Sequence, residues 1–135
     1  MSTPDHIRLA MGEIDGPVRI AALSVESARK IGANTRSVLL SKHNLKKQFE
    51  HHPEFEIHHT EIIQWIIETG EEVLDRKSSV IHYVANCAEI FGYSAKVTIK
   101  STKTGNEVWF TSMHPIRDRD IKRLKRRARN IRLVK

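Results

Sequence analysis

Lysine, serine, threonine and histidine side chains that could handle a phosphate alternate with apolar residues between Ser94 and Pro115. This alternation, broken by a turn at Lys103-Thr104-Gly105, predicts a β-hairpin, because successive side chains of a strand point to opposite faces. With a three-residue loop, one face of the hairpin carries Lys96, Thr98, Lys100, Phe110, Ser112 and His114. Ammonium groups, hydroxyls, an imidazole and an aromatic ring suit an RNA-binding surface, and the ordinary alternative is a solvated outer face.

The opposite face of the predicted hairpin is apolar. It carries Val97, Ile99, Trp109 and Met113, which we expect to face the core. Phe110 would then lie on the polar face, where its ring could stack on a base.

A helix predicted from Lys42 to His52 is a further source of acid–base groups. Ser41 has the side chain of an N-cap, and a proline ends the helix. His52 shares an inward stripe with Leu45, a position that suits either a catalytic histidine or one hydrogen-bonded into the core. Lys47 lies on the opposite side of the helix, where it would be either a substrate-binding or a solvated lysine.

Together these residue types could cleave RNA without a metal. A base removes the proton of the ribose 2′-hydroxyl, an acid protonates the leaving 5′-oxygen, and cations or hydroxyls stabilise the charge that develops on the phosphate. Histidine suits both proton transfers because its unperturbed pKa lies near neutrality. The candidates for this chemistry are His52, Lys47, Lys96, Lys100, Ser112 and His114.

The net charge of +7 is concentrated near the C-terminal end of the chain. Residues 115–135 hold ten Lys and Arg against two Asp, so residues 1–114 carry −1 in total. A helix predicted from Arg117 to about Arg129 bears most of these cations, which favours contact with the phosphates of a nucleic acid. We expect RNA binding by Lys100, Phe110, Arg117, Arg123, Arg126 and Arg127. An acidic protein partner is an alternative, and a membrane surface is disfavoured because the helix lacks large apolar anchors.

Other chemistries have little support. The pairs His51-His52 and His58-His59 are adjacent, whereas helical metal sites use i, i+4 spacing, so we predict no metal and no cofactor. There is no phosphate-cradling glycine loop and no serine in a glycine-flanked elbow. The single cysteine, Cys87, indicates a reducing compartment. Without a signal peptide or an apolar run of about 20 residues, we expect a cytoplasmic protein.

The order of the predicted elements is that of an α+β domain with about four antiparallel strands. We expect residues 1–36 to form an irregular lead-in with one short helix from Ser24 to Ile31. Residues 37–135 should form the domain, with helices packed on one side of the sheet and the basic helix last. Its elements are a strand at Ser37–Leu40, helices at Lys42–His52 and Glu61–Glu68, strands at Glu72–Leu74 and Ser79–Ala85, the hairpin and the basic helix.

A resemblance to a known family rests on the runs LLSKHNLKKQFEHHPEF, VIHYV and AKVTIKSTKTGNEVWFTSMH. With the isoleucine-rich helix between the first two, these runs resemble the phage-type members of the barnase–EndoU–colicin–RelE (BECR) superfamily of small ribonucleases. The resemblance spans about residues 37–119. By matching, the positions of the family's motifs fall on Ser41, Lys47, His52, Thr111 and Ser112, so Thr111 joins the catalytic candidates.

The resemblance implies a small metal-independent endoribonuclease, toxin-like or phage-associated, with an acidic antitoxin or immunity protein as a candidate partner. The residues themselves leave a second function open, a non-catalytic nucleic-acid-binding domain in which the basic helix binds and the histidines are structural. A third possible function is a protein-interaction module whose basic helix binds an acidic partner.

Overall fold

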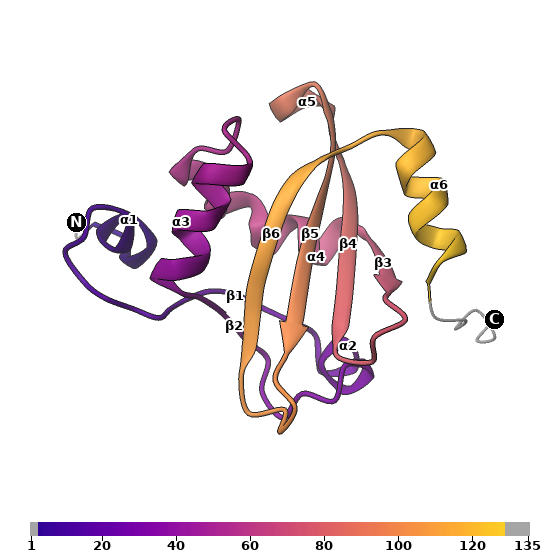
Figure 1. The fold of residues 1–135 in the computed structure, drawn as a ribbon, viewed down its shortest axis with the longest axis horizontal. Coiled ribbons are helices and arrows are strands. Elements are labelled where there is room, and N and C mark those ends of the chain that lie inside the picture. Colours follow the sequence, from indigo (N-terminus) through magenta and orange to yellow (C-terminus); the bar gives the residue numbers. More distant parts are fainter. Residues whose placement is uncertain (1–2, 129–135) are drawn as a thin grey trace.

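The computed structural model describes residues 3–128 of the 135-residue chain and is built on one six-stranded sheet, in the order β1-β2-β6-β5-β4-β3 (Figure 1). The strands are β1 (Val18–Ala22), β2 (Ser37–Leu40), β3 (Glu71–Leu74), β4 (Val80–Cys87), β5 (Tyr93–Ser101) and β6 (Val108–Ile116). Neighbouring strands are antiparallel except β2 and β6, which are parallel. The predicted α+β class is correct, whereas the expectation of about four antiparallel strands was too low and missed the parallel pair.

Helices lie behind the sheet and at its two flanks in Figure 1. They are α1 (Asp5–Ala10), α2 (Val25–Lys30), α3 (Lys42–His51), the 3-10 helix η1 (Ile57–Ile62), α4 (Ile63–Thr69), α5 (Ala88–Phe91) and α6 (Asp118–Arg126). The last helix was expected to reach about Arg129, which lies outside the described residues. Among residues 3–128, no helix has the length and hydrophobicity that a membrane crossing requires.

Local capping signals explain where two of these helices begin. The side chains of Ser24 and Ser41 each accept a hydrogen bond at 3.0 Å from the backbone N–H three residues later, which satisfies one of the free donors at a helix start. Helix α4 has no side-chain cap, because it follows directly on η1, whose N-cap residue is Glu56.

The N-terminal segment is more ordered than its sequence predicts. Residues 5–10 form α1, so the expected irregular lead-in is wrong there, and residues 18–22 form β1, which was not predicted. β1 pairs antiparallel with β2 and so forms one edge of the sheet.

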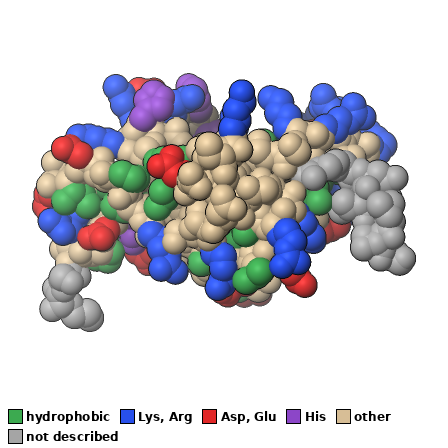
Figure 2. Space-filling model, turned by 90° about the horizontal axis from the view of Figure 1, so that it is seen from below, with side chains coloured by type: hydrophobic (Ala, Val, Ile, Leu, Met, Phe, Trp, Pro, Cys, Tyr) green, Lys and Arg blue, Asp and Glu red, His purple; other side chains and the backbone are tan. Residues whose placement is uncertain are grey.

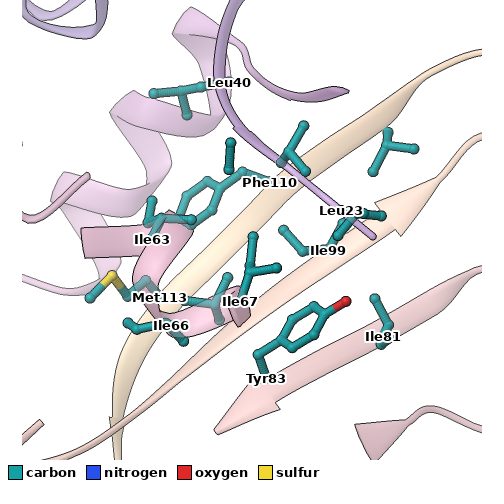
Figure 3. Close-up of a cluster of buried hydrophobic side chains, with 14 of the residues drawn as sticks. Leu23, Leu40, Ile63, Ile66, Ile67, Ile81, Tyr83, Ile99, Phe110 and Met113 are labelled. Atoms are coloured by element: carbon teal, nitrogen blue, oxygen red, sulfur yellow. The ribbon is translucent and has the colours of Figure 1, made fainter. Parts of the chain in front are cut away.

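The core lies between α4 and one face of the sheet (Figure 3). Ile63, Ile66 and Ile67 of α4 are buried against side chains of the central strands. Those side chains include Ile81 and Tyr83 of β4, Ile99 of β5, and Phe110 and Met113 of β6. The other face of the central strands is turned away from α4, and we call it the open face.

A β-bulge in β6 decides which side chains reach the open face. Thr98 pairs with Ser112, and the next residue, Ile99, pairs with Phe110, so Thr111 is an extra residue without a partner. The Thr111 hydroxyl donates to the Thr98 carbonyl oxygen at 3.0 Å, which holds the bulge in place.

The extra residue reverses the alternation of side chains along β6. Phe110 is fully buried in the core, whereas Trp109 lies opposite Lys100 on the open face. The expectations that Phe110 stacks on a base and that Trp109 faces the core are therefore wrong, because strict alternation cannot foresee an inserted residue.

Helix α3 covers the edge of β6 that β2 leaves free. β2 pairs with β6 only at Val108 and Trp109. Beyond them, Asn44 Nδ2 donates to the Phe110 carbonyl oxygen at 2.9 Å. Gln48 Nε2 donates to the carbonyl oxygen of Met113, whose N–H donates back to Gln48 Oε1 at 3.1 Å. The C-terminal end of α3 is thereby held beside the last residues of β6.

Candidate functional site

The open face presents three rows of side chains across β4, β5 and β6, because residues paired across neighbouring strands share a face. The rows are Val84, Lys96 and His114; then His82, Thr98 and Ser112; then Val80, Lys100 and Trp109. The predicted polar face is thus confirmed except for Phe110, whose place Trp109 takes.

His52 and His114 meet at the top of this face. Their rings stack with centroids 5.0 Å apart and an angle of 13° between the planes. His52 is the C-cap residue of α3, so the bonds between α3 and the β6 edge bring it to His114. Its Nδ1 lies 3.7 Å from the Glu54 carboxylate, a distance that allows an ion pair when His52 carries a proton. Two imidazoles close together are a sound basis for acid–base chemistry.

The surroundings of His114 favour its neutral ring, with the lone pair on Nε2. Its Nδ1 lies 2.9 Å from the Pro115 carbonyl oxygen, which can only accept, so Nδ1 carries the hydrogen and Nε2 has the lone pair in the neutral ring. Burial lowers the pKa of His114, and the positive charges of Lys96 and His52 lower it further. At neutral pH the unprotonated ring of His114 is therefore favoured, which is the form that a general base requires.

Lys96 is a half-buried cation beside His114. Burial lowers its pKa, and the charge of Asp75 opposes that shift. In the part of the chain that the structure describes, the Lys96 ammonium has no hydrogen-bonded or ion-paired acceptor. A half-buried cation without a protein partner is well suited to bind an anion such as a phosphate.

A chain of three side chains crosses the middle row of the open face. Asp75 Oδ1 lies 2.9 Å from His82 Nε2, and His82 Nδ1 lies 2.9 Å from the Thr98 hydroxyl. Since the carboxylate only accepts, His82 Nε2 donates to it, and Nδ1 of the neutral ring accepts from Thr98. His82 is only 6% exposed, so it is buried although it lies on the open face. Burial lowers its pKa, while the bond to Asp75 acts the other way.

A cleft of about 480 Å³ opens between this face and α6. Lys96 and His114 line its floor, and Arg123 and Arg127 line the wall that α6 provides. Lys125 Nζ holds α6 against β3 through a 2.7 Å ion pair with Glu71. In Figure 2, Lys, Arg and His side chains follow the upper edge, which is the side of the molecule that faces the viewer in Figure 1. Among the described residues, four Lys and Arg side chains line the cleft against two carboxylates, those of Asp75 and Asp120, so the charge of its lining is positive overall.

Not every predicted catalytic residue reaches this cluster. His52, Lys96 and Ser112 do, since Ser112 follows Lys96 and His114 along the open face. The Thr111 hydroxyl donates its hydrogen bond to the Thr98 carbonyl oxygen within the bulge. Lys47 is exposed on α3 and has no hydrogen-bond or ion-pair partner among the described residues.

The predicted RNA-binding residues divide in the same way. Lys100 is exposed on the open face, and Arg123 and Arg127 line the cleft. Arg117 and Arg126 are exposed at the two ends of α6 without lining it. Sequence reasoning missed Asp75 and the pairing of His114 with His52. The alternation did place His114 on the same face as Lys96, but no local signal relates Asp75 to His82.

Glu56, His58 and His59 form the cluster whose spacing best fits a metal ion, with ligand atoms within 4.8 Å of one another. His59 Nδ1 accepts a 2.9 Å hydrogen bond from the Glu56 N–H, so the proton of the neutral ring is on Nε2. In this arrangement neither ring nitrogen of His59 offers a lone pair to a metal, and the bond instead caps η1.

Comparisons of this chain with protein-family models, with curated proteins and with solved structures gave no match.

Proposed function

We propose that this chain is a small metal-independent endoribonuclease of the BECR type, toxin-like or phage-associated and acting in the cytoplasm. The observation that carries the proposal is the His52–His114 stack beside Lys96, which has no ion-pair partner among residues 3–128, at the edge of a basic cleft. Two acid–base groups and a phosphate-binding cation can supply the proton transfers and the charge stabilisation that favour cleavage of RNA at a 2′-hydroxyl.

In the proposed reaction His114 is the general base. Its Nε2 takes the proton of the ribose 2′-hydroxyl, and the 2′-oxygen forms a bond to the adjacent phosphorus. His52 is the general acid, which gives its proton to the 5′-oxygen as the bond from that oxygen to phosphorus breaks. The products are a 2′,3′-cyclic phosphate and a free 5′-hydroxyl, and the two histidines have exchanged protonation states.

Lys96 and Ser112 are the proposed phosphate ligands. Both lie on the open face: Lys96 of β5 pairs with His114, and Ser112 is two residues before His114 on β6. Charge that develops on the phosphate oxygens is stabilised most by a cation that is already desolvated, because the interaction is then weakly screened. Arg123 and Arg127 would hold the neighbouring phosphates of the RNA chain.

A non-catalytic RNA-binding domain is the second candidate. The observation that favours it is α6, whose exposed arginines and lysines would bind phosphates whether or not the histidines act. An acidic antitoxin or immunity protein could occupy the same basic cleft.

The test is cleavage of total RNA by the purified protein in EDTA, compared with His114→Ala and His52→Ala. The matched control is His43→Ala, since His43 is exposed on α3 away from the stack. We expect cleavage in EDTA and a loss of about 10²–10⁴-fold in each of the two variants, with the control unchanged. Tight, salt-sensitive binding of RNA that stays intact would contradict the enzyme and support the binding domain.

A further inference from the structure

We propose that Trp109 and Lys100 form a base-stacking platform at the turn end of the open face, so that the chain binds single-stranded RNA. The position of the scissile phosphate relative to this platform rests on the proposed function. The platform itself can be tested without any cleavage.

The platform belongs to a row of side chains that crosses four strands. Arg19 of β1 pairs with Leu39 of β2, Leu39 with Trp109 of β6, and Trp109 with Lys100 of β5. Trp109 is partly exposed, and Arg19 and Lys100 are exposed. The indole offers a flat surface for a base, Lys100 beside it offers a charge for a phosphate, and Arg19 offers a second charge one strand beyond Leu39.

The β6 bulge is what brings the indole to this face. If Thr111 were regularly paired and there were no bulge, strict alternation would put Trp109 on the core face with Met113, and Phe110 would point outward. Instead, the smaller ring of Phe110 fills the core and is fully buried, and the indole is left at the surface. Nothing in the packing of the core requires a tryptophan at this position.

The platform and the proposed catalytic groups lie along the same strands. Lys100 is four residues from Lys96 on β5, which corresponds to about 13 Å at the rise of a strand. β5 and β6 contain no Asp or Glu, so no carboxylate of these strands interrupts the path between Trp109 and His114. An RNA chain can therefore run along the hairpin with one base on Trp109 and a phosphate at Lys96.

Stacking on a protein ring requires a base whose own face is free. In a duplex both faces of each base are covered by its neighbours, whereas single-stranded segments can turn their bases out onto aromatic side chains. The platform therefore selects unpaired RNA over duplex RNA.

Tryptophan fluorescence reports on the platform directly. The chain has two tryptophans, and the second, Trp65, is 43% exposed on α4, away from the open face. Trp65→Phe leaves Trp109 as the only indole, and Trp109→Phe leaves Trp65 as the matched control. The probe is a 2′-O-methyl RNA oligonucleotide, which cannot be cleaved by 2′-hydroxyl attack, used alone and annealed to its complement.

We expect the single-stranded probe to quench the fluorescence of Trp65→Phe but not that of Trp109→Phe. We expect Trp109→Ala to weaken binding of this probe about 10- to 100-fold, while Trp109→Phe, which keeps a ring, binds nearly as the wild type does. Bound probe without quenching of Trp109, or equal affinity of wild type and Trp109→Ala, would overturn the platform. Because the probe is inert, neither result depends on whether the protein cleaves RNA.

Discussion

Gln48 of α3 and Met113 of β6 are joined by two hydrogen bonds, so that one side-chain amide satisfies both backbone groups of a buried strand residue. The amide makes the two backbone hydrogen bonds that a neighbouring strand would make at this edge, where the pairing with β2 has already ended. The same contact fixes the end of α3, and with it His52, beside His114.

Replacing Gln48 should therefore destabilise the protein and disturb the histidine stack. Gln48→Ala leaves the N–H and C=O of Met113 without partners, and we expect a loss of about 1–3 kcal/mol in the free energy of unfolding for each buried group left unpaired. Urea unfolding measures the loss. Glu50→Ala, an exposed change on the same helix, is the control, and an equal effect of both changes would contradict the strand-like role of Gln48.

The pH dependence of cleavage should report the environment of His114. The base must be unprotonated, and its pKa is lowered from 6.5, so the acid limb of the kcat/KM profile should have its midpoint below pH 6.5. Lys96→Gln removes a charge that lowers this pKa, so it should move the midpoint upward as well as reduce the rate. Lys100→Gln, two rows away on the open face, should reduce binding without moving the midpoint. If the midpoint stays in place in Lys96→Gln, His114 is not the base.

Stability should fall in mild acid because of His82. Its pKa is lowered by burial from 6.5, so as the pH drops below 6.5 the unfolded chain takes up a proton before the folded protein does. The resulting loss in the free energy of unfolding is about 1.4 kcal/mol for each unit by which the pKa is lowered. The loss is complete once the pH has fallen below the pKa of His82 in the folded state. Denaturant unfolding above and below pH 6.5 measures this slope. His82→Asn should reduce this slope, with the part due to the lowered pKa of His114 remaining, while His43→Asn, at an exposed position of α3, should leave it as it is.

The arginines of α6 should set the salt dependence of RNA binding. If Arg123 and Arg127 each neutralise one phosphate of a single strand, the double change to Gln should reduce the slope of log K against log salt by about 1.4. Lys125→Gln should change the slope much less, because the ion pair of Lys125 with Glu71 is close, at 2.7 Å, whereas Arg123 lies 3.9 Å from Asp120. Equal effects per charge removed in the two variants would contradict this prediction, because RNA binding would then depend only on the total charge of α6.

Gly105 in the β5–β6 turn should tolerate no side chain. Its φ is +78°, and a Cβ there would lie 2.2 Å from the Gly32 carbonyl oxygen. Gly12 has nearly the same φ, +77°, with nothing within 4 Å of a Cβ, so Gly12→Ala measures the backbone cost alone, about 1–2 kcal/mol. Thermal unfolding should show a clearly larger loss for Gly105→Ala, and losses of equal size would mean that the turn can move away from Gly32.

Signals that lie within a few residues of one another could be interpreted from the sequence. Serine caps predicted α2 and α3, and alternation predicted β5 and its polar set of Lys96, Thr98 and Lys100. These patterns report on the element that contains them, because capping and alternation depend on neighbours in the chain. The basic helix belongs to the same group, since its charge is a property of one short run.

Relationships between distant segments were decided only by the tertiary structure. The exchange of Phe110 and Trp109 depends on how β5 pairs with β6, and the meeting of His52 with His114 depends on a hydrogen-bonded contact between Gln48 and Met113, 65 residues apart. Asp75 became part of the site because β3 ends where His82 faces it across the β3–β4 turn. The chain alone therefore determined which side chains are available, and long-range packing decided which of them share a site, because register and edge contacts are set by the burial of the whole core.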